Sequence, residues 1–152
     1  EEYGGDYDQS FPIQDADERT IGSCGMGVNL QDGTMRGDPN RVVALSVWLL
    51  DKSSPQQLGD HRRTLISEYV IDHEMEALYA DQQADVGLPI VAQPGTSFTI
   101  EGSNLTLACR ILEAGYSDAP GSAGVFQHVR LEIDVVKPRK SSRTQSNLNT
   151  PY

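Results

Sequence analysis

The segment with the clearest chemical potential is a glycine-rich stretch around a cysteine, Gly22-Ser-Cys-Gly-Met-Gly27. A glycine-rich turn exposes a thiolate or directs backbone N–H groups at an anion, so an enzyme centred on Cys24 is one hypothesis. The spacing matches no catalytic motif, because Met26 stands where a nucleophile elbow has its second glycine, and no phosphate-loop lysine follows. We therefore interpret the segment as a flexible entry into the first strand.

The second cysteine, Cys109, falls on the apolar face of an expected strand. A free thiol in that position packs as a small hydrophobic group. A disulfide between Cys24 and Cys109 is the alternative, and it would suit an exported protein. The spacing of two cysteines does not decide between the two states.

The histidines, His61, His73 and His128, show no metal-ligand spacing. The segment that begins at His73 lacks the second histidine of the zinc-protease helix. His128 alternates with Arg130 and Glu132 on the polar face of an expected strand, which is typical of solvated surface. The sequence therefore predicts no metal site, no cofactor and no catalytic residue.

The acidic N-terminal segment resembles a calcium loop only in part. Oxygen-bearing residues from Asp6 to Asp17 follow the spacing of calcium ligands, but Phe11 occupies the position that needs glycine. Calcium binding there remains an alternative. The connection 113–124 is rich in glycine and serine, and Tyr116 is its one large side chain, so this loop is a second candidate binding element.

The elements that must position these residues are mostly strands, because apolar and polar residues alternate with period 2. The segment 42–50 is apolar on both faces and is expected as a central strand covered on both sides. The residues between Ile100 and Leu105 predict a tight hairpin. The expected strands are 42–50, 65–71, 98–101, 105–111 and 125–136.

One helix interrupts this pattern. Asp72 is a favourable N-cap, and Glu74 and Glu76 suit the positive end of a helix dipole, so one short helix is predicted near 73–83. Short strands separated by turn signals, without βαβ alternation, indicate a mainly β protein. We predict an antiparallel β-sandwich of the Ig-like or jelly-roll type.

The charge is unevenly distributed over the 152 residues, whose net charge is −10. Residues 1–20 carry seven acids against Arg19, a net charge of −6, whereas residues 137–152 carry four basic residues and no acid. The acidic total argues against a nucleic-acid partner. No apolar run approaches the roughly 20 residues of a membrane helix. The chain starts at Glu1 without a methionine, which favours an exported or trimmed protein.

These observations divide the chain into an acidic N-terminal arm (1–20), a β-sandwich domain (21–137) and a basic polar C-terminal tail (138–152). The main functional prediction is a non-catalytic structural or interaction subunit of a larger protein assembly, which contacts itself or another subunit through both arms. The alternative is a sandwich that binds carbohydrate or calcium through the loop 113–124 or the acidic arm. The predicted interaction residues are Tyr3, Tyr7, Phe11, Ile13, Tyr116, Arg139, Lys140 and Arg143.

Overall fold

The computed structural model describes residues 7–29, 33–35, 37–52, 61–80 and 88–136. Within these ranges the protein is mainly β, as predicted, with strands in sheets of the orders β1-β2-β5-β6-β7, β10-β9-β8 and β3-β4. The strands are β1 (Gln9–Gln14), β2 (Thr20–Val28), β3 (Thr34–Met35), β4 (Asp38–Val42), β5 (Ala44–Asp51), β6 (His61–Ile66), β7 (Ile90–Val91), β8 (Ser97–Glu101), β9 (Thr106–Tyr116) and β10 (Phe126–Val136).

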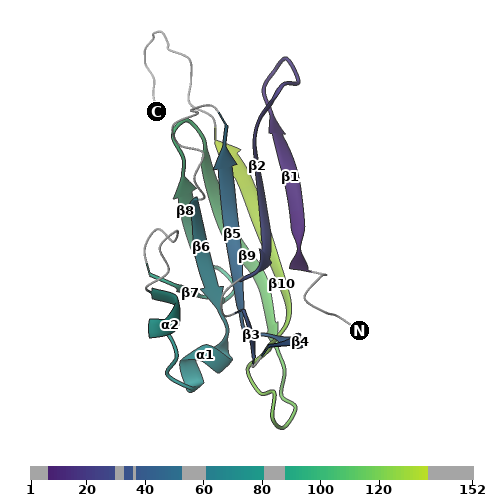
Figure 1. The fold of residues 1–152 in the computed structure, drawn as a ribbon, viewed down its shortest axis with the longest axis vertical. Helices are drawn as coiled ribbons and strands as arrows, with labels where there is room; N and C mark the ends of the chain where they lie inside the picture. Colours follow the sequence, from purple (N-terminus) through teal and green to yellow (C-terminus); the bar gives the residue numbers. More distant parts are fainter. Residues whose placement is uncertain (1–6, 30–32, 36, 53–60, 81–87, 137–152) are drawn as a thin grey trace.

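The three-stranded sheet lies behind the five-stranded sheet in the view of Figure 1, with α1 (Glu68–Asp72), α2 (Ala77–Ala80) and the β3–β4 pair near one end. Buried side chains of both sheets form one apolar cluster. Leu45 and Leu49 of β5 and Leu107 and Ile111 of β9 belong to it, and each is fully buried. Removal of this apolar surface from water is the main favourable term in folding.

The strands with the clearest alternation are confirmed. On β9, Leu107, Cys109 and Ile111 are buried while Arg110 is exposed. The predicted hairpin joins β8 to β9, and the Gly102 N–H donates to the Leu105 carbonyl at 2.7 Å. The central position of this strand is also confirmed, since β5 pairs with β2 on one side and β6 on the other. The predicted cover on both faces is only partly present, because Trp48 and Leu50 on the outer face are half-buried.

The prediction of one short helix near 73–83 is correct in part, because α2 lies within that range, but the predicted start at Asp72 is wrong and another helix precedes it. The first helix, α1, follows Ser67 and ends at Asp72, with His73 as its C-cap, and Glu74 then takes a φ of 56°. The second, α2, begins at Ala77, and residues 81–87 lie outside the described ranges. The predicted strand 65–71 therefore ends at Ile66.

Tertiary contacts explain the early helix. The Tyr69 N–H donates to the carbonyl of Gly124 at 3.0 Å, which ties α1 to the β9–β10 connection. Val70 is fully buried in a second apolar cluster with Tyr79 and Val125. These contacts with distant segments override the strand preference of the β-branched Val70 and Ile71.

Three further features differ from a simple antiparallel arrangement with two free arms. The short β7 pairs with β6 in parallel. The segment expected as the N-terminal arm supplies β1, an edge strand paired with β2, and Ile13 is buried in the core. The strand β9 continues to Tyr116, so the β9–β10 connection covers residues 117–125 rather than 113–124. The predicted tail 138–152 lies outside the described residues.

Candidate functional site

An apolar groove of about 680 Å³ lies between β1 and β2 on one side and β10 on the other. Its walls are built by strand alternation, which sends every second side chain of each strand toward the space between the sheets. Phe11 and Ile13 come from β1, Met26 from β2, and Leu131 and Ile133 from β10.

The exposure of these side chains shows that the groove is incompletely covered. Phe11 shares its side of β1 with Ile13, yet Phe11 is 53% exposed while Ile13 is 5% exposed. On β10, Leu131 and Ile133 are only half-buried, whereas Cys109, which pairs with Ile133 on the neighbouring β9, is buried. Apolar side chains that face inward without full cover are typical of interaction surfaces.

One wall of the groove is the edge of a sheet. Ten of the 11 residues of β10 pair with β9. The strand is the terminal one of its sheet, so its other edge carries no neighbouring strand among the described residues. The edge strand β1 is a poorer acceptor for a further strand, because Pro12 has no N–H group to donate to it. An edge strand with free N–H and C=O groups accepts another strand by main-chain hydrogen bonds.

The opposite face of β10 is charged and already paired with β9. Arg130 contacts Glu113 at 2.9 Å, and His128 lies 3.5 Å from the same carboxylate. Glu132 contacts Arg110 at 3.5 Å. These pairs are about half exposed, so each adds little to stability, roughly 0–1 kcal/mol. The two faces of β10 therefore differ: one is a polar surface, and the other is an apolar groove wall.

Both ends of β1 are acidic. Asp8 precedes the strand and accepts a hydrogen bond from the Val28 N–H at 3.2 Å. The turn after β1 holds Asp15, Asp17 and Glu18, and Arg19 contacts the first two of these at 3.6 and 3.1 Å. The groove is thus lined mainly by apolar residues, together with Gln9, Gln14 and Arg130, and acidic residues lie at both ends of its β1 wall.

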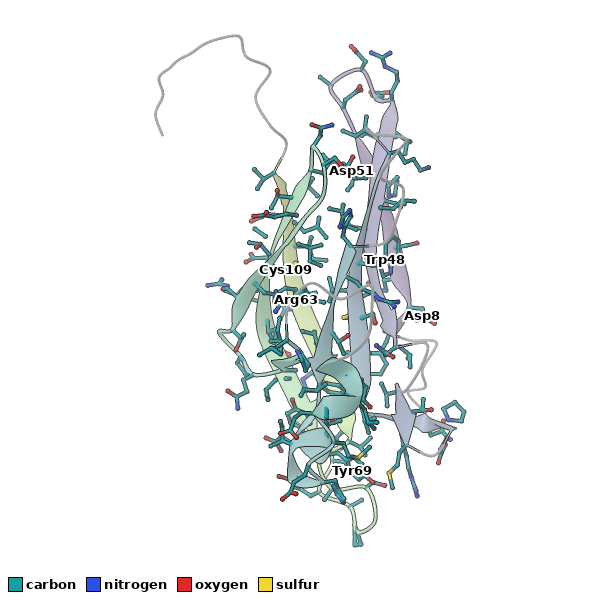
Figure 2. The ribbon with its side chains drawn as sticks, turned by 60° about the vertical axis from the view of Figure 1, so that its left-hand side comes forward. Asp8, Trp48, Asp51, Arg63, Tyr69 and Cys109 are labelled. Carbon is teal, nitrogen blue, oxygen red and sulfur yellow. The ribbon has the colours of Figure 1, made fainter. Side chains whose placement is uncertain are left out.

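A second hollow of about 510 Å³ lies on the outer face of the five-stranded sheet. Trp48 lies over Gly25 of the neighbouring strand, where a built Cβ would come within 2.6 Å of the indole Cζ2. Ser10, Arg62 and Asp8 also line this hollow, and Figure 2 labels Trp48 and Asp8 on this part of the molecule. The partial exposure of Trp48 was not expected from the sequence, because Trp48 lies in the mostly apolar segment 42–50.

The glycine-rich segment around Cys24 is not a flexible entry. It forms the middle of β2, between β1 and β5, and Gly25 fits where a side chain would collide with the Gln9 carbonyl oxygen and the indole of Trp48. Cys24 itself is 4% exposed, and burial raises the pKa of its thiol. A raised pKa keeps the thiol protonated at neutral pH, the opposite of what a cysteine nucleophile needs.

The predicted interaction residues are placed in different parts of the molecule. Phe11 and Ile13 meet in the groove. Tyr7 is buried, and Tyr116 stacks on Phe126 at 5.3 Å and donates its hydroxyl hydrogen to the Ala92 carbonyl. Burial, and to a lesser degree the charge of Glu68, raise the pKa of Tyr116. Tyr3, Arg139, Lys140 and Arg143 lie outside the described residues.

The part of the chain that the structure describes contains no cluster of His, Cys, Asp or Glu side chains able to hold a metal ion. Asp6, the first of the candidate calcium ligands, is outside that part, and residues 9–14 form a strand rather than a loop. Neither described helix has the length and apolar character needed to cross a bilayer. Comparisons with protein families, curated proteins and solved structures found no match.

Proposed function

We propose that the protein is a non-catalytic interaction subunit in which the two larger sheets form a β-sandwich that is one strand short beside β10. The groove between β1 and β10 is the binding site, and the half-buried inward row of β10 carries the proposal. The occupant is an extended segment of a partner protein, which adds to the β10 edge by main-chain hydrogen bonds.

The chemistry of the groove defines the partner segment. An added strand sends every second side chain into the groove, against Phe11, Met26 and Leu131, so these side chains must be apolar. The acidic residues at both ends of β1 favour lysine or arginine flanking the apolar stretch. Main-chain pairing supplies affinity, and the alternate apolar side chains supply specificity.

The proposal is tested with a peptide as long as β10, 11 residues, with valine at every second position and lysine at both ends. Addition of this peptide should slow hydrogen exchange of the β10 amides, because strand pairing protects groups that are otherwise open to water. A control peptide of the same composition with its valines grouped together should not. Binding can be measured in parallel by isothermal titration calorimetry.

Matched variants locate the binding site. Leu131→Glu places a charge in the groove and should abolish peptide binding, whereas Asp134→Asn on the exposed face of the same strand should leave it unchanged. Protection that appears away from β10, or equal binding to both variants, would show that the groove is not a strand acceptor.

A second candidate is carbohydrate binding, at the outer hollow rather than at the loop 113–124. An indole with a nearby carboxylate, guanidinium and hydroxyls can stack on the apolar face of a sugar ring and hydrogen-bond its hydroxyl groups. Trp48 is the one tryptophan in the chain, so its fluorescence reports this hollow alone. Titration with neutral gluco-, manno- and chitooligosaccharides should shift the emission, and Arg62→Ala should weaken the response. Unchanged emission with all three would remove this candidate.

A further inference from the structure

The two cysteines lie in the core between the two larger sheets. Cys24 comes from β2 and Cys109 from β9, and both belong to the apolar cluster that joins the sheets. Their exposed fractions are 4% and 3%. Figure 2 labels Cys109 at mid-length of the three-stranded sheet.

Contacts near the Asp51 end of the core bring β2 and β9 together. A Cβ built on Gly22 would lie 3.0 Å from Cδ1 of Leu105, so the start of β2 packs against the start of β9. Gly22 pairs with Asp51, and the Asp51 carboxylate accepts a hydrogen bond from the Leu105 N–H at 3.0 Å. From this point Cys24 is two residues along β2 and Cys109 is four residues along the chain into β9, and both are free thiols buried in the same apolar cluster.

Two further observations connect the positions of the two thiols. Cys24 lines the groove together with Ile133, and Ile133 is the register partner of Cys109 on the neighbouring strand. In addition, the pKa of Cys109 is raised to about 12, first by burial and then by the charge of Cys24, with a smaller effect of Asp134.

We propose that Cys24 and Cys109 form a disulfide that cross-links the two sheets when the protein meets a disulfide oxidant such as oxidised glutathione. Cys24 reacts first, because it lines the groove: its thiolate attacks one glutathione sulfur and releases one reduced glutathione. The Cys109 thiolate then attacks the Cys24 sulfur of the mixed disulfide and releases the second. The protein loses two hydrogens and the oxidant is reduced to two thiols.

The raised pKa values of both thiols make the exchange slow in the folded protein, because the thiolate is the attacking species. The cross-link closes the chain between residues 24 and 109, which constrains the unfolded state. For a chain of this size, the melting temperature should rise by roughly 5–15 °C.

The test uses the full chain, both folded and during refolding from urea, in oxidised and reduced glutathione. Both thiols are exposed during refolding from urea. If no disulfide forms under this condition, burial of the thiols cannot be the reason. Intact mass should fall by two hydrogens, and digestion without reduction should yield a Cys24–Cys109 peptide pair. The higher melting temperature should revert with dithiothreitol.

Single variants separate the internal bond from other oxidation. In Cys109→Ala, oxidation should end with a glutathione adduct on Cys24. Dithiothreitol should not change the melting temperature of either Cys109→Ala or Cys24→Ala. Circular dichroism of the reduced variants checks that they fold. If both wild-type thiols are still alkylated after oxidative refolding, or if they form only intermolecular bonds, the proposal is overturned.

Discussion

Asp51 shows how one residue joins the two sheets. It ends β5, is fully buried, and accepts hydrogen bonds from the N–H groups of Asn104 at 2.6 Å and Leu105 at 3.0 Å. These donors belong to the turn between β8 and β9, so the carboxylate ties one sheet to the hairpin of the other. Gly102 permits this approach, since a Cβ there would lie 2.9 Å from the Asp51 Oδ2.

Asp51→Ala should lower the free energy of unfolding by about 1–3 kcal/mol, because two backbone donors lose their buried acceptor. Asp51→Asn keeps one acceptor oxygen and should cost less. Urea unfolding followed by circular dichroism measures both, with the exposed Asp134→Ala as a control. A loss for Asp51→Ala no larger than that of the control would mean that the anchor adds nothing to stability.

At the scale of elements, alternation predicted β9 and β10 well. The inward row from Leu107 to Ile111 is buried, and the row from Val129 to Val135 is inward but only half covered. The same alternation did not indicate that β10 is an edge strand with a groove beside it. That property depends on which strands pair, and strand pairing is a long-range feature.

The helices show the opposite case, in which local signals were misleading. Asp72 was predicted to begin a helix, yet it is the last residue of α1. The chain bends into α1 at Ser67 because Val70 fills a buried site and the Tyr69 N–H meets the Gly124 carbonyl. Those partners are far away in sequence, so no local pattern around residue 70 reveals them.

At the scale of the whole molecule, charge separation favours association. The segment 1–20 has a net charge of −6, its described part lies along one wall of the groove, and the segment 137–152 has a net charge of +4. We predict that the C-terminal tail of one copy contacts the acidic ends of β1 in another. Head-to-tail contacts of this kind close into rings or continue as filaments.

Sedimentation of the full chain tests this prediction. Association should weaken as salt rises, because the Debye length falls from about 10 Å at 0.1 M to about 3 Å at 1 M. The combined variant Arg139→Ser, Lys140→Ser and Arg143→Ser should reduce association at low salt without lowering the melting temperature. If the unaltered chain and the triple variant are both monomers at low salt and micromolar concentration, self-assembly is contradicted. The remaining hypothesis is then that the arms contact a different protein.

The sequence by itself determined the mainly β class, the inward faces of β9 and β10, the central place of β5 and the β8–β9 hairpin. Each depends on period-2 alternation or on a short turn, which are local properties of the chain. The tertiary structure alone decided that residues 9–14 form an edge strand, that Trp48 faces the outer hollow, and that Cys24 and Cys109 are buried in the same apolar cluster. Those features arise where strands distant in sequence pair and pack, and side-chain burial is then set by neighbours that local spacing does not specify.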